Sequence, residues 1–173
     1  PSGKLNETYP LHYEDTPAYE YYPSKERSSE YREGLYVGYR YYTTVGKKVR
    51  FPFGFGLSYT TFTYRDLAVD QDGVTFKIKN TGTVAGTEIA QLYVGKESDS
   101  VFRPLRELKG FARVTLAPGE EKEVRILFDD KTFRFYDTRT DSWEVETGTY
   151  QIMIGSNAEE MLLEGSLAVN GTV

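Results

Sequence analysis

Few residues in this chain combine a reactive side chain with the partner groups that catalysis needs. His12 is the single histidine, so a Ser-His-Asp relay could be built only through it. The chain has no cysteine, whereas a typical zinc site needs several imidazole or thiolate ligands. We therefore expect His12 to be a solvated or interface residue, and we assign no metal ligand.

Ser58 lies in a short stretch that contains glycine, Gly56-Leu57-Ser58-Tyr59-Thr60. A nucleophile elbow has the form G-x-S-x-G, but Thr60 occupies the place of the second glycine. Gly54 and Gly56 resemble the start of a phosphate-binding loop, but the later glycine and lysine are missing. The pattern favours a tight bend where backbone passes close to another surface, and it predicts no cofactor-binding residue.

Adjacent carboxylates deserve separate weighing, because glycoside cleavage needs one acid and one nucleophile or base on opposite sides of the scissile bond. The adjacent pairs are Glu120-Glu121, Asp129-Asp130 and Glu159-Glu160. Each pair lies at a predicted turn or strand end, where nothing would desolvate a carboxyl group and raise its pKa. We therefore assign no catalytic residue in this chain.

Aromatic residues are concentrated near the start of the chain, where 16 of the 26 fall within the first 64 positions. Aromatic faces can stack on sugar rings, and the candidates are Tyr36, Tyr39, Tyr41, Tyr42, Phe51, Phe53, Phe55 and Trp143. Such residues also suit a surface pressed against another protein layer, because they bring much apolar area. We favour domain packing for the candidates before residue 60, and core or edge packing in a strand of the sandwich for Trp143.

Size and charge limit the classes of protein to which the chain can belong. At 173 residues it can form one domain with a core plus an appendage. A net charge of -5 without a basic patch argues against a nucleic-acid partner. No apolar run approaches the ~20 residues that cross a bilayer, so we expect no membrane partner. Pro1 stands where a translation product has methionine, and we expect a fragment of a longer protein.

The elements that position these residues divide near Thr60. Residues 1–60 hold five of the seven prolines, which fix φ and push the preceding residue toward extended backbone. We therefore predict an extended aromatic-rich arm over 1–60, with one short helix around Ser28 to Glu33 that Ser28 or Ser29 caps.

Residues 61–173 show short alternating runs that turn residues separate. The apolar positions of these runs are Val74, Phe76 and Ile78; Ala90, Leu92 and Val94; Val124, Ile126 and Phe128; and Tyr150, Ile152 and Ile154. Turn signals are Asp72-Gly73, Thr81-Gly82, Ala85-Gly86, Pro118-Gly119 and Thr147-Gly148. Seven or more short strands at this spacing predict an all-β, immunoglobulin-like antiparallel β-sandwich.

Several segments together resemble one family. EGLYVGYRYY and FPFGFGLSYTTFTY are similar to the junction that precedes the fibronectin type III-like domain of family 3 glycoside hydrolases. The same family is matched by KNTGTVAGTEIAQLYV at 79–94, RPLRELKGFARVTLAPGE at 103–120 and FYDTRTDSWEVETGTYQIMIGSN at 135–157. The opening GKLNETYPLHYEDTPAY resembles the tail of the family's α/β sandwich domain. The chain departs from the pattern at 128–134, where a proline often found in the family is absent.

The resemblance implies that the parent protein is a retaining β-glycosidase, most often a β-glucosidase, that works without a cofactor. Its aspartate nucleophile would lie in a barrel domain and its acid/base usually in the α/β sandwich domain, and neither motif is present here. The chain would then be a non-catalytic accessory module whose partners are the parent's catalytic domains. The arm's aromatics would bury against that missing part; in the isolated module the arm would be mobile, or fold onto its own sandwich or a neighbouring copy.

A different class stays open, namely an independent carbohydrate-binding or adhesion module that uses its aromatics as stacking platforms. The arm separates the two hypotheses, because a free-standing binder has little reason to carry so much aromatic material outside its sandwich.

Overall fold

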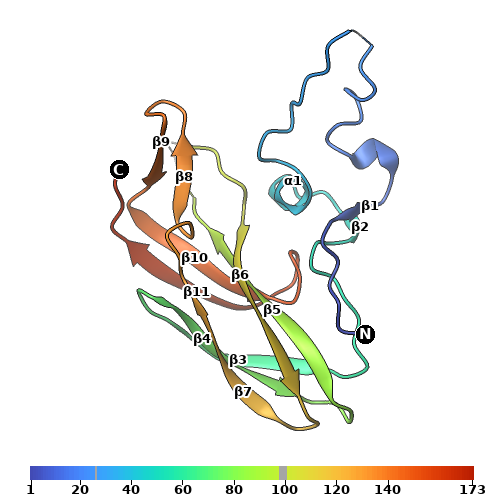
Figure 1. Ribbon diagram of the computed structural model, residues 1–173, viewed down its shortest axis with the longest axis vertical. Coiled ribbons are helices and arrows are strands. Elements are labelled where there is room, and N and C mark those ends of the chain that lie inside the picture. Colours follow the sequence, from blue (N-terminus) through green and yellow to red (C-terminus); the bar gives the residue numbers. More distant parts are fainter. Residues whose placement is uncertain (26, 98–100) are drawn as a thin grey trace.

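The chain folds into two antiparallel sheets that pack face to face, with an arm beside one of them (Figure 1). The computed structural model describes residues 1–25, 27–97 and 101–173. One sheet has the strand order β11-β10-β5-β6 and the other has the order β3-β4-β7. The strand bounds are β3 Phe62–Val69, β4 Gly73–Asn80, β5 Gly86–Gly95, β6 Glu107–Leu116, β7 Glu121–Leu127, β10 Gly148–Gly155 and β11 Met161–Val169. The predicted β-sandwich is confirmed.

Alternating apolar residues build the core between the sheets. Val74, Phe76 and Ile78 of β4 are fully buried, and Val124 and Ile126 of the paired strand β7 lie beside them. The facing sheet contributes Ala90, Leu92, Val94, Leu116, Tyr150, Ile152, Ile154 and Leu167. Because side chains on a strand point alternately to its two faces, the spacing in the sequence predicted these core residues apart from Leu116 and Leu167.

Strand β5 differs from this pattern because both of its faces are buried. Gln91 and Tyr93 lie on the face opposite Leu92 and Val94, yet Gln91 is 3% exposed and Tyr93 is fully buried. Tyr93 belongs to a second, smaller cluster that packs the arm against the outer face of the four-stranded sheet. The arm therefore folds onto its own sandwich.

The arm contains little regular structure, and most of it is turns and extended chain. Its elements are β1 Tyr9–Pro10, the 3-10 helix η1 Tyr13–Asp15, α1 Tyr39–Thr44 and β2 Val49–Phe51. Strands β1 and β2 pair antiparallel, so the two ends of the arm lie together. No helix in the described ranges is long and apolar enough to cross a membrane.

The predicted helix around Ser28 to Glu33 is wrong, since those residues form bends and irregular chain. Ser24 Oγ donates to Ser28 O at 2.7 Å, and a side-chain-to-backbone hydrogen bond of this kind favours a turn over a helix. The observed α helix lies instead at Tyr39–Thr44, directly after Gly38 at φ 56°. Six residues rich in tyrosine and threonine are marginal as an isolated helix, and burial of Tyr42 to 4% exposure helps to hold this one.

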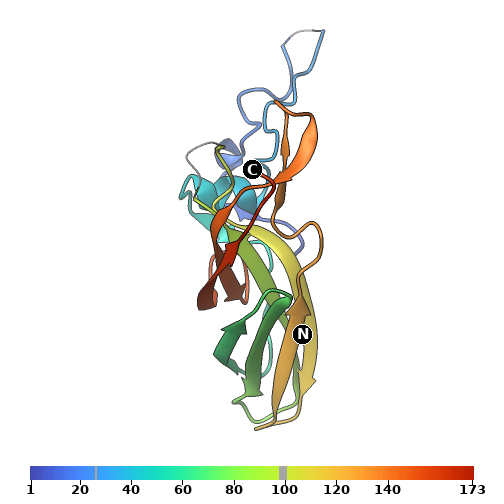
Figure 2. The same cartoon turned by 90° about the vertical axis from the view of Figure 1, so that its left-hand side faces the viewer.

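A two-stranded ribbon projects beyond the sheets at the end where the arm's long loop lies (Figures 1 and 2). It consists of β8 Arg134–Asp137 and β9 Ser142–Val145. Trp143 lies on this ribbon, so its predicted place in a strand of the sandwich is wrong. Its ring is 58% exposed and packs edge-on against Tyr136, with 5.4 Å between the ring centroids.

Candidate functional site

The structure does not join the candidate catalytic residues into a relay. His12 is exposed just before η1, and its backbone N–H donates to Asp15 Oδ2 at 3.1 Å. Ser58 Oγ accepts a hydrogen bond from the backbone N–H of Thr60 at 3.3 Å. Within the described residues no hydrogen bond links the side chains of His12 and Ser58. The same ranges hold no group of three or more His, Asp or Glu residues that could bind a metal ion.

Three of the paired carboxylates have pKa values that are shifted away from what an acid catalyst needs. The backbone N–H of Ala117 lowers the pKa of Glu120, and hydrogen bonds from Arg65 lower that of Glu121. A threonine hydroxyl lowers the pKa of Asp129. These groups stay ionised near neutral pH, whereas a general acid needs a raised pKa.

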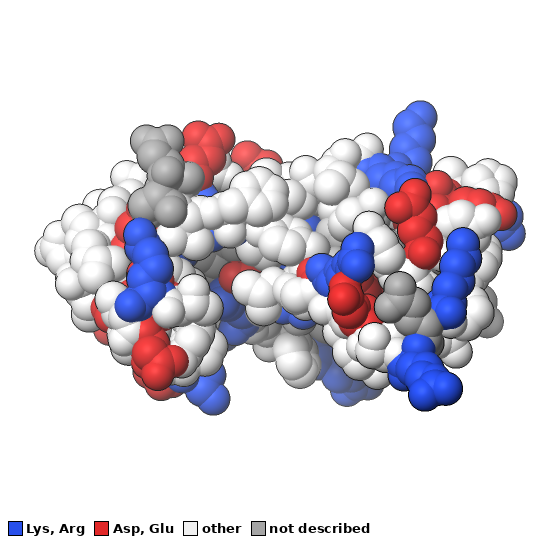
Figure 3. All heavy atoms as spheres, turned by 90° about the horizontal axis from the view of Figure 1, so that it is seen from above, with Lys and Arg blue, Asp and Glu red and all other residues white. Residues whose placement is uncertain are grey.

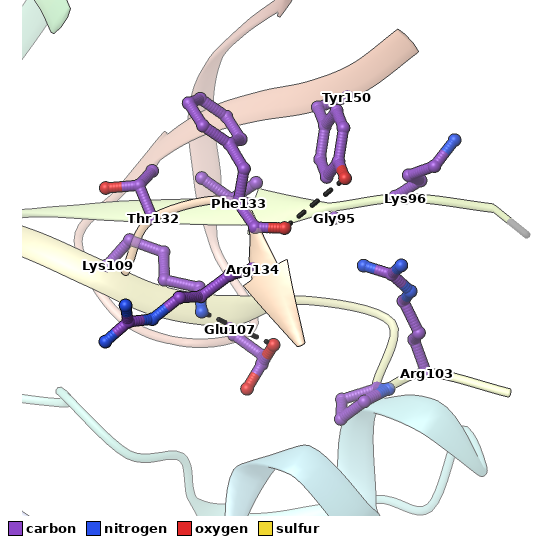
Figure 4. A pocket seen from close by; sticks show the side chains of 11 residues that line it. Gly95, Lys96, Arg103, Glu107, Lys109, Thr132, Phe133, Arg134 and Tyr150 are labelled. Atoms are coloured by element: carbon purple, nitrogen blue, oxygen red, sulfur yellow. Dashed lines mark hydrogen bonds and ion pairs between the residues drawn. The ribbon is translucent and has the colours of Figure 1, made fainter. Parts of the chain in front are cut away.

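A small hollow where residues 103–107 meet the start of β8 is also unsuited to sugar cleavage (Figure 4). Its volume is about 20 Å³, which is room for a water-sized molecule and far too small for a sugar ring. Glu107 is the one carboxylate on its wall, and it faces Lys109 at 3.5 Å and Arg40 at 3.8 Å. The hollow therefore lacks the second carboxylate that glycoside cleavage requires.

The face in Figure 3 shows positive and negative side chains interspersed among uncharged ones. Mixed charge of this kind gives no basic stripe for a phosphate backbone.

The glycines before Ser58 form the predicted close bend. Gly54 has φ 81°, and a Cβ added there would lie 2.1 Å from Oε1 of Gln91 on β5. A Cβ on Gly56 would lie 2.5 Å from the carbonyl oxygen of Gly3. Only glycine permits both the positive φ of Gly54 and this close approach of backbone to β5. The predicted bend is confirmed, and its partner surface is the outer face of the chain's own sheet.

Polar side chains lock the bend to the sheet. Gln91 Nε2 donates to Ser156 O at 2.7 Å and to Gly54 O at 3.3 Å, and Tyr93 Oη donates to Gln91 Oε1 at 2.7 Å. Lys4 Nζ lies 2.8 Å from Glu88 Oε1, with side-chain exposures of 14% and 9%. Buried polar groups of this kind are stable only when they are fully partnered, so they fix one position of the arm.

Aromatic rings, together with the polar contacts of Lys4, Glu88 and Gln91, anchor the arm to the sheet. The Tyr39 ring lies 5.0 Å from that of Phe53 and 5.9 Å from that of Tyr93 on β5. Tyr39 Oη accepts a hydrogen bond from the backbone N–H of Leu108 at 2.8 Å. Burial raises the pKa of Tyr39, so its hydroxyl stays neutral. Of the arrangements expected for the arm of the isolated module, folding onto its own sandwich is the one observed, and for Tyr39 and Phe53 this packing replaces the expected burial against a missing domain.

Other aromatic and apolar residues of the arm remain accessible. A hollow that is lined only by arm residues contains Pro1, Leu5, Tyr9, Phe51, Phe55 and Leu57. Tyr9 is 44% exposed, Phe51 is 39% exposed and Leu57 is 68% exposed. The arm therefore has an inner surface on the sandwich and an outer apolar surface, and the outer surface is the candidate functional site.

Sequence reasoning missed the anchor residues Lys4, Glu88 and Gln91. Their only signal lay in β5: Gln91 stands where alternation predicts solvent, and Glu88 stands in phase with Ala90, where alternation predicts the core. A second buried layer was needed to explain them, and periodicity in a single strand does not show which layer covers it.

The sandwich and its strand order place the chain in the class of fibronectin type III-like modules, and the family model described as "Fibronectin type III-like domain" matches residues 88–158. The thermostable beta-glucosidase B of Acetivibrio thermocellus is 47% identical over 100% of this chain. The probable beta-glucosidase K of Emericella nidulans is 48% identical over 99% of it. The crystal structure of a Bifidobacterium adolescentis GH3 beta-glucosidase superposes with a TM-score of 0.93 at 36% identity, over 99% of this chain.

The chain belongs to the family 3 glycoside hydrolases, as the part that holds their fibronectin type III-like domain. It spans 24% and 21% of the two curated relatives and 26% of the solved chain. The predicted family resemblance is confirmed.

Proposed function

We propose that this chain is a non-catalytic accessory module of a retaining β-glucosidase. The arm joins the sandwich to the catalytic domains and holds them in a fixed orientation. The complete protein hydrolyses terminal β-linked glucose or a related sugar by double displacement, with both reacting carboxylates outside this chain.

One observation carries the proposal: the arm is fixed on its inner side and apolar on its outer side. The inner side holds the Lys4–Glu88 ion pair and the Tyr39–Phe53–Tyr93 rings. The outer side exposes Tyr9, Phe51 and Leu57. Burying apolar area stabilises by ~25 cal/mol per Å², so a few such side chains suffice to hold two domains together.

The test uses this chain and the catalytic domains of the same protein produced as separate polypeptides. The isolated chain should not turn over an aryl β-glucoside, because both reacting carboxylates of the proposed enzyme lie outside it. Adding it to the catalytic domains should raise their melting temperature and their activity. Sustained turnover by the chain alone, lost when one of its carboxylates is replaced, would falsify the proposal.

A second candidate function is carbohydrate binding on the β8–β9 ribbon. Trp143 and Tyr136 are 58% and 46% exposed, and Arg134 lies over the Trp143 ring at 5.0 Å. Exposed aromatic faces of this kind can stack on sugar rings. Saturable binding of a cello-oligosaccharide that Trp143→Ala weakens would support this function, and unchanged binding would count against stacking.

A further inference from the structure

We propose that the outer hollow of the arm is a preformed seat for an apolar side chain of the catalytic domains. This inference rests on the proposed function and names the place where the contact is made. The hollow is formed by Leu5, Tyr9, Phe51, Phe55 and Leu57.

The walls of the hollow are fixed by backbone pairing. Tyr9 pairs with Phe51 across β1 and β2, while Leu5 N–H donates to Phe55 O and Gly54 N–H donates to Leu5 O, both at 2.8 Å. The Phe51 ring lies 6.4 Å from that of Tyr9 and 5.0 Å from that of Phe55. A partner would therefore meet an ordered surface, and little entropy would be lost in forming it.

The chemistry of the walls favours an apolar occupant over a sugar. A sugar site needs polar groups that converge on hydroxyls as well as a ring for stacking. The lysine that reaches the hollow, Lys4, already pairs with Glu88 at 2.8 Å. The hydroxyl of Tyr9 contacts Glu7 at 3.5 Å, outside the lining residues. The remaining side chains that line the hollow are apolar.

The share of the relatives that this chain spans favours the catalytic domains over a second copy of the chain. About three quarters of each relative lies outside the matched region. In a continuous polypeptide that part is tethered to the arm, and short tethers give effective concentrations on the order of millimolar. A second copy of the chain would have to compete for the hollow from free solution. Exposed aromatic residues of this kind commonly lie at the centre of an interface.

The test takes advantage of the absence of cysteine in this chain. Leu57→Cys places a thiol on the rim of the hollow, at a position that is 68% exposed, so the variant should fold. The matched control is Leu127→Cys on β7, where the native side chain is 64% exposed and lies outside the arm. Each is labelled with a thiol reagent in the isolated chain and in the complete protein, with the unsubstituted complete protein as background.

We expect the thiol at position 57 to react in the complete protein at about one tenth of its rate in the isolated chain, or at a lower rate. A covered thiol can react only when the contact that covers it opens locally. The control thiol at 127 should react at similar rates in both. Equal rates at 57 would overturn the inference. Slowing in the isolated chain that grows with its concentration would point to a second copy, and slowing by a cello-oligosaccharide would point to a sugar; either result also overturns it.

Failure of the inference can be told from failure of the proposed function. If the isolated chain raises the activity and melting temperature of the catalytic domains while the thiol at position 57 is labelled at equal rates, the accessory role stands and the contact lies elsewhere on the arm. If the chain restores nothing, the accessory role itself fails.

Discussion

Lys4 Nζ lies 2.8 Å from Glu88 Oε1, and this ion pair ties the start of the arm to strand β5. Lys4 Nζ also contacts Ser156 O at 3.3 Å, and Glu88 Oε1 accepts from the Ile89 N–H at 3.0 Å. Both side chains are largely buried, so neither charge can turn to water when its partner is lost. The pair therefore acts as a registration point for the arm.

Lys4→Met should destabilise the chain by about 3 kcal/mol, because it leaves the Glu88 carboxylate buried and unpaired. Urea unfolding of the variant measures the change in the free energy of unfolding. The double variant Lys4→Met/Glu88→Leu is the control, since replacing a buried pair by apolar residues is often nearly neutral. A double variant that loses the sum of the two single losses would show that the pair is not coupled.

Gly54→Ala should destabilise more than Gly46→Ala, although both glycines have positive φ. A Cβ at Gly54 would lie 2.1 Å from Gln91 Oε1, whereas a Cβ at Gly46 would meet nothing within 4 Å. Both variants have backbone strain, and only Gly54→Ala also overpacks the contact with β5, which adds about 1–3 kcal/mol. Thermal unfolding of the two variants gives the comparison, and equal losses would mean that the bend does not bear on β5.

The sandwich could be predicted from the sequence because apolar residues alternate along β4, β5, β7 and β10 and turn residues separate these strands. Val74, Phe76 and Ile78 alternate without interruption, and all three are fully buried. Turn signals such as Pro118-Gly119 fall between strands, and Gly119 has φ 74°. Local patterns of this kind need no knowledge of distant residues.

The arm could be predicted only in outline, because distant contacts fix its structure. Nothing in the sequence distinguishes Tyr39 and Phe53 from Phe51, yet the first two pack on the sandwich and Phe51 stays accessible. Which of them faces inward depends on the outer face of β5, where Tyr93 lies 40 residues after Phe53 and 54 residues after Tyr39. The family resemblance supplied the expectation of a missing partner, and the structure shows which side of the arm is accessible.

Asn80→Ala should cost about 2–4 kcal/mol, since it leaves several buried groups without partners. Asn80 is fully buried; its Nδ2 donates to Val84 O at 2.8 Å and Leu116 O at 3.1 Å. Its Oδ1 accepts from Thr60 Oγ1 at 2.6 Å. Thr60→Val removes one of these bonds and should cost about 1 kcal/mol. Chemical denaturation of both variants tests the ranking, and a Thr60→Val loss as large as that of Asn80→Ala would contradict it.

Acid should weaken the fold partly through Asp70, whose carboxylate binds Arg125. Arg125 Nη1 lies 2.9 Å from Asp70 Oδ2, and this contact lowers the pKa of Asp70 from 3.8 to about 2. Because the folded-state pKa is the lower one, the contribution is present above pH 4 and is lost as the pH falls toward 2. Asp70→Asn should therefore flatten the fall in melting temperature between pH 4 and 2, and Arg125→Gln should flatten the same window. The effect should be small because both groups are exposed and screened. If the melting temperature of both variants falls between pH 4 and 2 as steeply as that of the unsubstituted chain, other carboxylates such as Glu121 cause the acid sensitivity.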